Sequence, residues 1–387
     1  MYPLNLYVEN PESYGDFYRS HEIDKKIIIN EYDEAAILPL KFFPDPKPWG
    51  RFAGGVIDKK NKFCAGLTRE LRNQTLCCSS YDVSNLEFIY SNEVIYFAGV
   101  IFPFFGHVIL ETLSRFWGII DKNDNYKLAF VLFQENMPIP SYFLELIDLL
   151  NISRERILII SKPTRFKKVI VPDESFMMGT GFSRKYMNTI EKIKSNLPNS
   201  SLKKVYCTRT IFKHDCINEE YFENFYKKQG YAIIAIEQLS VKEQLAIWKN
   251  VEDIVCVAGT LSHMILFSAQ NTKLTILNRT EHSIALQAYI NELAKPNCSF
   301  VDVHHNILPT DHNCQGFILG PTKYWEKFIK DNSMKWTNED FMFDISPFLK
   351  EYLTKWCLYY SEERFFGGIT NKTARDFLNF LRKELLP

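Results

Sequence analysis

The sequence predicts an α/β protein of two domains, and three observations support this prediction. The chain has 387 residues, which is more than one hydrophobic core usually organises. Strand-like and helix-like segments alternate along most of it, as they do in parallel βαβ units. Hydrophobic residues make up 46% of the chain and aromatic residues 15%, which is enough for large packed cores and argues against disorder.

Composition also narrows the function classes. Basic and acidic residues balance at 46 each, so the chain lacks the charge footprint of a nucleic-acid binder. Nine cysteines without a C-x-x-C pair are typical of a reducing compartment rather than of a disulfide framework. The N-terminal segment has no signal-peptide pattern, and the longest apolar run, 94–105, has about 12 residues where a bilayer-spanning helix needs roughly 20. We therefore expect a cytoplasmic protein.

We assign residues 1–196 to an N-terminal domain. Residues 1–90 show little regular pattern, apart from strand-like segments at 26–30 and 86–90 and a proline-rich loop at 44–50. The further elements predicted for this domain are strands at 93–97, 127–133, 156–160 and 167–171, and helices at 106–117, 141–150 and 183–195.

A polar, proline-containing segment at 196–201 separates this domain from a second one, residues 197–320. Five strands and four helices alternate there within about 100 residues, which predicts a doubly wound Rossmann-like sheet. Residues 321–387 form a helical, aromatic tail with helices at 348–360 and 371–386, and we expect this tail to pack back on the N-terminal domain. The strands of the second domain are expected at 204–208, 231–236, 253–258, 274–277 and 299–303, and its helices at 218–229, 241–250, 261–269 and 283–293.

The helix at 106–117 carries the first candidate site. His107 and Glu111 are four residues apart, so their side chains can touch. A neutral imidazole beside a carboxylate can accept a proton near pH 7. The alternative is an ordinary amphipathic helix on which Glu111 pairs with Arg115 at a solvated surface. On the same segment, Arg115 and Trp117 are weaker candidates for contact with an acceptor.

The ends of two strands in the second domain carry the other candidates. Open parallel sheets bind ligands at the carboxyl ends of their strands. Arg209 follows the first strand and can grip phosphate, or it can pair with a nearby acidic side chain. The turn from Gly259 opens a helix whose N–H groups could bind a diphosphate, although many such turns have no ligand. The residues of this turn that we consider donor-binding candidates are Gly259, Thr260, Leu261, Ser262 and His263.

Other chemistries find little support. The chain contains no G-x-G-x-x-G, no phosphate-binding P-loop, no G-x-S-x-G and no pair of aspartates two residues apart. We expect no metal, because the densest ligand-type cluster lacks zinc-type spacing. A basic run at 162–168 is either a solvated edge or a contact with an anionic membrane. The ligand-type cluster considered for a metal consists of Asp302, His304, His305, Asp311 and His312.

Several short motifs occur in an order that resembles glycosyltransferase family 61, over roughly residues 93–305. This family groups bacterial capsule and lipopolysaccharide enzymes with plant xylan and animal protein O-glycan transferases. His263 departs from the pattern, since asparagine is common at this place in the family. The motifs are His107–Glu111, Val205-Tyr206-Cys207-Thr208-Arg209, Ile217-Asn218-Glu219, Gly230-Tyr231, Glu243-Gln244 and Ala258-Gly259-Thr260-Leu261-Ser262-His263-Met264.

The resemblance implies a GT-B fold of two Rossmann-like domains and an inverting transfer from a nucleotide sugar, usually a UDP-sugar. It implies no cofactor and no obligatory metal. By position, His107 and Glu111 match the acceptor-side pair, Arg209 the diphosphate-facing arginine, and Gly259 to His263 the donor turn. Either His107 or Glu111 could take the proton of the acceptor hydroxyl.

From these features we expect a glycosyltransferase that acts on an oligosaccharide, polysaccharide or glycolipid acceptor in bacterial capsule or surface polysaccharide synthesis, with peripheral membrane association as a further expectation. Two alternatives stay open: an NAD-dependent nucleotide-sugar epimerase or reductase, and a non-catalytic carbohydrate- or nucleotide-binding module. Stacking aromatics would serve an enzyme or a binding module equally well. The candidates for stacking are Trp49, Phe52, Trp117 and Trp325.

Overall fold

The α/β class predicted from the sequence is confirmed by a computed structural model, which forms two compact units. The mixed-sheet unit comprises Ser20–Pro198, and the parallel-sheet unit comprises Met1–Arg19 together with Asn199–Pro387. In the described part of the chain, no helix is long and apolar enough to span a membrane. The structure describes residues 2–43, 51–68, 70–71, 74–75, 79–122, 125–209, 215–281, 284–308, 310, 316–361 and 372–385.

The parallel-sheet unit is built on six strands that all run in the same direction, in the order β16-β14-β17-β18-β19-β1. Strand β14, the first one after residue 199, has β16 on one side and β17 on the other. The winding therefore reverses between β14 and β17. A crevice forms at such a reversal in open parallel sheets. The strands are β14 (Lys204–Thr208), β16 (Ala232–Ala235), β17 (Asp253–Val257), β18 (Lys273–Asn278), β19 (Asn297–Asp302) and β1 (Leu4–Tyr7).

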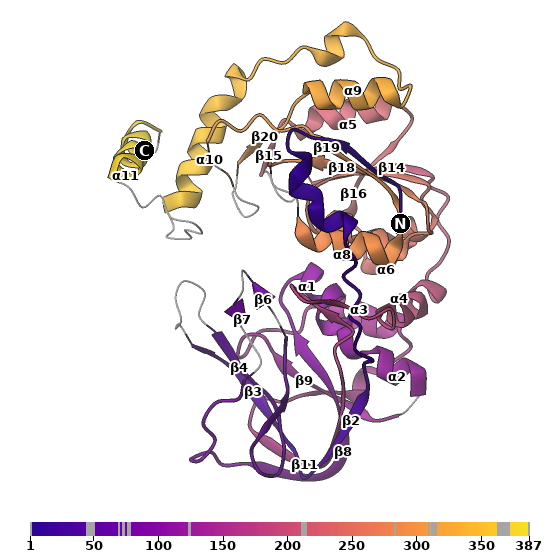
Figure 1. The fold of residues 1–387 in the computed structure, drawn as a ribbon, viewed down its shortest axis with the longest axis vertical. Helices are drawn as coiled ribbons and strands as arrows, with labels where there is room; N and C mark the ends of the chain where they lie inside the picture. Colours follow the sequence, from indigo (N-terminus) through magenta and orange to yellow (C-terminus); the bar gives the residue numbers. More distant parts are fainter. Residues whose placement is uncertain are drawn as a thin grey trace. The chain divides into compact units, whose positions relative to one another are not determined.

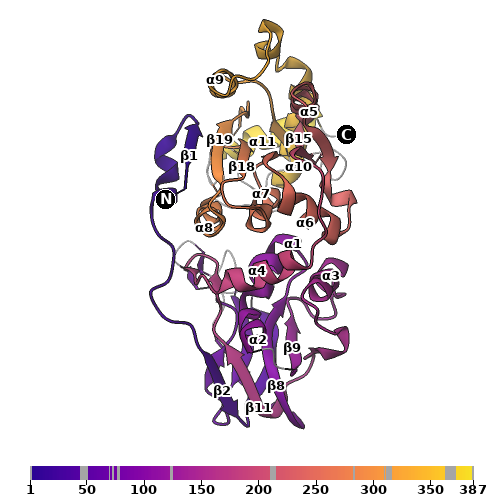
Figure 2. The ribbon, with the colours of Figure 1, turned by 90° about the vertical axis from the view of Figure 1, so that its right-hand side faces the viewer.

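Helices cover both faces of this sheet, with α5 and α9 on one side and α6 and α8 on the other (Figure 1; Figure 2). Buried apolar residues fill both faces of the central strands, which is why these strands read as continuous hydrophobic runs. A capping box between Ser240 and Glu243 starts α6 at the predicted residue. The helical segments are α5 (Glu219–Lys228), η4 (Ile236–Gln238), α6 (Val241–Asn250), α7 (Thr260–His263), η5 (Met264–Phe267), α8 (Ala285–Ala294) and α9 (Lys323–Asp331).

Two segments lie elsewhere than the sequence predicted. Leu4–Tyr7, assigned to the N-terminal domain, pairs with β19 of the parallel sheet, because a four-residue edge strand carries no pattern that names a partner so distant in the chain. The tail helices occur at the predicted places, but Tyr352 and Trp356 are buried in the same core cluster as Phe317 of the parallel-sheet unit. The other elements of the parallel-sheet unit, including the two tail helices, are η1 (Pro11–Tyr18), β15 (Cys216–Ile217), β20 (Phe317–Ile318), η6 (Asn338–Phe341), η7 (Ser346–Phe348), α10 (Leu349–Ser361) and α11 (Lys372–Leu385).

The mixed-sheet unit is organised around the long strand β8 (Ile89–Ile101), in the order β10-β9-β8-β11-β3-β4-β5. Strands β10, β9, β8 and β11 run parallel, whereas β3, β4 and β5 follow in antiparallel pairs. The prediction of a second Rossmann-like domain therefore differs from the structure here: residues of the first 90, expected to be irregular, extend the sheet with antiparallel strands.

The remaining bounds of this unit are β2 (Ile29–Asp33), β3 (Ala36–Phe43), β4 (Arg51–Ile57), β5 (Phe63–Ala65), β6 (Glu70–Leu71), β7 (Gln74–Thr75), β9 (Lys127–Leu132), β10 (Ile157–Ile159), β11 (Thr164–Pro172), β12 (Phe176–Met177), β13 (Gly181–Phe182), α1 (Phe105–Leu110), η2 (Thr112–Arg115), α2 (Trp117–Lys122), α3 (Ser141–Leu149), η3 (Arg154–Arg156) and α4 (Tyr186–Ser195). The predicted loop 44–50 lies outside the described residues.

Candidate active site

The helix predicted at 106–117 is divided into α1, η2 and the first residue of α2. Its polar side is not solvated: Thr112 and Ser114 are fully buried, and the Thr112 hydroxyl donates to the Val100 carbonyl at 2.7 Å. The segment follows the carboxyl end of β8, so strand contacts enclose the side that the helical pattern assigned to water. The interpretation as an ordinary surface helix is therefore wrong.

His107 and Glu111 do pair, with His107 Nδ1 and Glu111 Oε2 at 2.5 Å. The two side chains differ in access, because 32% of His107 is exposed and only 1% of Glu111. The Phe102 ring stacks on the imidazole at 5.3 Å and holds its plane. When Nδ1 carries the hydrogen that the carboxylate accepts, Nε2 carries the lone pair. The pair can therefore accept a proton at His107 while Glu111 stabilises the charge that results.

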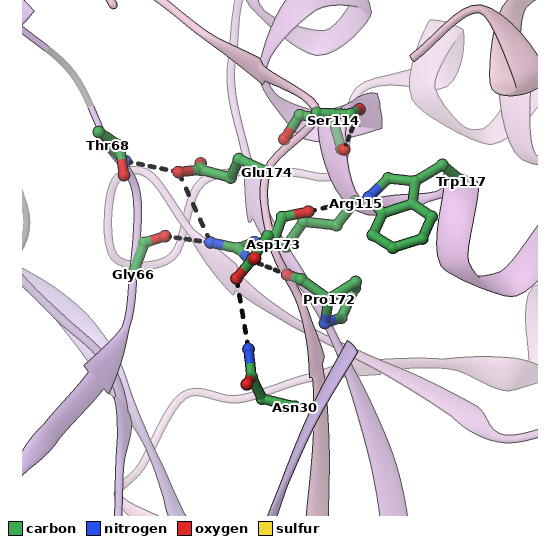
Figure 3. A network of polar contacts seen from close by, with 10 residues as sticks. Asn30, Gly66, Thr68, Ser114, Arg115, Trp117, Pro172, Asp173 and Glu174 are labelled. Carbon is green, nitrogen blue, oxygen red and sulfur yellow. Dashed lines mark hydrogen bonds and ion pairs between the residues drawn. The ribbon is translucent and has the colours of Figure 1, made fainter. Parts of the chain in front are cut away.

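Arg115, expected to pair with Glu111 or to face an acceptor, is instead buried in a network inside the mixed-sheet unit (Figure 3). Its guanidinium donates to the carbonyls of Gly66 and Pro172 and forms an ion pair with Glu174 at 3.6 Å. The Thr68 N–H donates to the same carboxylate at 3.0 Å. Burial raises the pKa of Glu174, while Arg115 acts in the opposite direction. This network ties together three separate segments of the chain.

Trp117 is also buried, at 2% exposure, and its Nε1–H donates to the Asp173 carbonyl at 2.9 Å. The Lys185 ammonium lies 4.1 Å from the centre of its ring. A side chain enclosed in this way has no free face for a sugar. The acceptor roles suggested for Arg115 and Trp117 are thus replaced by structural ones.

In the parallel-sheet unit, Arg209 and Gly259 follow β14 and β17, the neighbouring strands between which the winding reverses. Gly259 has a backbone φ of 149°, a conformation that residues with a Cβ rarely adopt. A Cβ there would also lie 3.2 Å from Nη1 of Arg209. The backbone conformation therefore favours glycine, and a Cβ would crowd the end of the Arg209 side chain.

A second arginine, which the sequence analysis missed, joins this position. Arg279 directly follows β18, and its Nη2 lies 4.0 Å from the Cβ position of Gly259. Asp215 Oδ2 contacts both guanidinium groups, at 3.0 Å from Arg279 and 3.6 Å from Arg209. The signal was available in principle, because Arg279 occupies the same place after its strand as Arg209 does. In the described part of the chain, two guanidinium groups and one carboxylate thus meet beside Gly259.

Glu219, the first residue of α5, lies behind the cluster and is 1% exposed. Its Oε1 accepts hydrogen bonds from the Arg209 N–H and the Tyr206 hydroxyl, both at 3.3 Å. Burial raises the pKa of Glu219 to about 8, against the opposing effect of Arg209. The carboxyl group is thus mostly protonated near neutral pH and adds little negative charge beside Arg209.

The other residues of the predicted donor turn have different surroundings. Helix α7 has only four residues, so it provides a weaker dipole than the sequence suggested. The Ser262 hydroxyl bonds to the Gly259 carbonyl and to Gln287, each at 2.7 Å, which fixes the turn against α8. Leu261 and His263 are buried. Thr260 is exposed beside Gly259 and has a side chain accessible to a ligand.

The cluster at the end of β19 is structural in the described part. Asp302 accepts hydrogen bonds from Asn278 at 2.7 Å and from the Glu9 N–H at 2.8 Å. Burial raises the pKa of Asp302 and lowers that of His304. Among the described residues no group of three metal-ligating side chains occurs, and Asp311 and His312 lie outside them.

Comparison with known protein families identifies a match to the central part of the chain. Residues 105–275 match the family model described as Glycosyltransferase 61. The matched stretch includes His107, Glu111, Arg209 and Gly259, and it ends before Arg279. No curated protein matches the chain.

Replacing Arg115 by methionine should lower the free energy of unfolding by about 3–5 kcal/mol, because it leaves Glu174 buried without its cation. Urea denaturation measures this change. The matched control is Arg154→Met, since Arg154 pairs with Asp148 at the surface; it should leave the free energy of unfolding almost unchanged. Equal effects of the two substitutions would show that the buried network does not stabilise the unit.

The raised pKa of Glu219 predicts a specific pH dependence of stability. The folded state holds this proton up to about pH 8, whereas the unfolded chain releases it near pH 4.3, so the residue's contribution to stability falls as pH rises between these values. Denaturation midpoints across this range should therefore depend less on pH in Glu219→Gln than in the wild type. Its exposed neighbour provides the control, Glu220→Gln. A Glu219→Gln profile that follows the wild type would contradict the burial effect.

Proposed function

We propose that this chain, which belongs to glycosyltransferase family 61 through residues 105–275, is an inverting enzyme of the GT-B type. The donor is a nucleotide sugar, most simply a UDP-sugar, and the acceptor is a glycan hydroxyl in bacterial capsule or surface polysaccharide synthesis. The observation that carries the proposal is the convergence of Arg209 and Arg279 on Gly259, at the reversal point of the parallel sheet.

The arginine cluster has the chemistry of a diphosphate site. Guanidinium groups bind phosphate oxygens in a bidentate manner, and their charge persists at all physiological pH values. Arg209 and Arg279 are both about nine-tenths buried, so their attraction for an anion is screened less than at an open surface. Gly259 leaves room beside both guanidinium groups, and Thr260 can add a hydroxyl donor. Asp215 holds the two arginines in a fixed spacing.

The acceptor-side pair supports His107 as the base. Glu111 is buried and directed at Nδ1 of His107, so it lacks the access that direct contact with an acceptor would need. His107 is partly exposed, and its Nε2 has the lone pair that a hydroxyl proton can join. Glu111 then orients the ring and stabilises the imidazolium, as the carboxylate does in catalytic triads.

In this mechanism the acceptor oxygen attacks the anomeric carbon of the donor sugar while its proton passes to Nε2 of His107. The bond between the anomeric carbon and the diphosphate oxygen breaks on the opposite side, which inverts the configuration. Negative charge grows on the departing diphosphate, and the two arginines stabilise it. The sequence has no D-x-D element, so the arginines supply the positive charge that a metal ion provides in other transferases, and no cofactor is required.

The base assignment predicts that His107→Ala loses transfer by about 10²- to 10⁴-fold, with nucleotide binding unchanged. Glu111→Gln should keep the fold and should lose less transfer activity than His107→Ala. It removes the negative charge that orients His107 but leaves the imidazole in place. Nucleotide release from a panel of UDP-sugars with glycan acceptors measures both. Glu93→Gln, which breaks the exposed pair with Lys127 in the same unit, is the control. Near-wild-type turnover in His107→Ala would eliminate this residue as the base.

The donor assignment predicts that Arg209→Ala and Arg279→Ala each weaken UDP binding by about 10- to 100-fold, the loss expected for a charged hydrogen bond. Titration calorimetry with UDP, CMP and NAD measures the affinities and identifies the nucleobase that the protein prefers. Arg19→Ala, which removes an exposed arginine of the same unit, should bind like the wild type. Tight NAD binding without UDP binding would instead indicate an epimerase or reductase.

A further inference from the structure

A row of aromatic rings runs through the mixed-sheet unit to His107. Phe42 and Phe52 are cross-strand partners of β3 and β4, with ring centres 5.1 Å apart. Phe52 contacts Phe133 at 4.6 Å, Phe133 contacts Phe102 at 5.0 Å, and Phe102 stacks on His107 at 5.3 Å. Five separate places in the chain contribute to this row, so it is a product of the fold rather than of a local sequence run.

The row begins beside His107, the residue proposed as the base. Phe102 and Phe133 directly follow the last residues of β8 and β9, neighbouring parallel strands. Figure 1 shows α1, which carries His107, at this end of β8 and β9. The row therefore continues from the base into the mixed-sheet unit at the carboxyl ends of its parallel strands.

Access along the row is graded. Phe42 is 56% exposed, Phe52 and Phe133 are partly exposed, and Phe102 is buried. The buried ring fixes the imidazole plane, whereas the three outer rings keep surface available to a ligand. A core cluster would enclose all of its rings, so this gradient indicates a binding surface that is anchored at one end.

We propose that Phe42, Phe52 and Phe133 form an acceptor subsite, which binds sugar rings of a glycan whose attacking hydroxyl lies at His107. Aromatic rings offer a flat, electron-rich face to the polarised C–H groups of a pyranose, and sugars stack on them for this reason. This inference rests on the proposed transferase function and specifies its acceptor as a glycan held at more than one residue.

Binding of purified protein to a printed array of bacterial, plant and animal surface glycans tests the subsite without need for turnover. The wild type should bind at least one glycan class, and Phe52→Ala and Phe133→Ala should weaken this binding by about tenfold. Phe42→Ala should act in the same direction, and it is safe for the fold because the ring is mostly exposed. Phe52→Tyr, which retains a ring, should keep most of the affinity.

Tyr90→Ala is the matched control, because Tyr90 is a 76% exposed aromatic residue at the opposite end of β8. Wild-type protein that binds no glycan overturns the proposal, and so do Phe variants that bind like Tyr90→Ala. The transferase function is judged separately by UDP titration. Intact UDP binding with no effect of the Phe variants rejects the subsite alone, whereas absence of UDP binding rejects the transferase, whatever the array shows.

Discussion

The buried ion pair between Arg115 and Glu174 fixes the part of the mixed-sheet unit on which the proposed acceptor chemistry depends. Removing both charges from water is costly, and the cost is offset only because the guanidinium also satisfies two backbone carbonyls and Thr68 also bonds the carboxylate. The pair thereby joins the end of β11 to η2, and η2 begins directly after Glu111. Glu111 itself has almost no solvent contact, so its position, and with it the orientation of His107, follows from this packing.

The proposed donor site depends on the topology of the parallel sheet rather than on one contact. Because β14 lies between β16 and β17, the residues that follow β14 and β17 meet at the reversal of the winding. Arg279 reaches the same place from the end of β18, and Asp215 links the two guanidinium groups. Burial raises the pKa of Glu219 to about 8, so this carboxyl adds little negative charge beside Arg209 near pH 7. The cluster thus combines a fixed geometry with guanidinium groups of the kind that the proposed diphosphate site requires.

The sequence predicts local features well and long-range ones poorly. The strand at 204–208 and the helix at 241–250 have the predicted bounds, because apolar runs, caps and polar breaks are encoded nearby. The pairing partner of Leu4–Tyr7 cannot be predicted from nearby residues, since β19 is almost 300 residues away. His107 and Glu111 could be paired from their spacing, but the burial of Arg115 depends on Glu174, 59 positions later. Arg279 was missed because no motif marks it; only the shared edge of the sheet does.

A crystal structure of the wild-type protein with bound UDP tests the central claim most directly, because the claim concerns where a diphosphate lies. The account predicts that phosphate oxygens contact Arg209 and Arg279 and approach the Cα of Gly259, with Thr260 within hydrogen-bond distance. UDP bound at another place in the parallel-sheet unit, or bound through its base alone with the diphosphate away from both arginines, would contradict it.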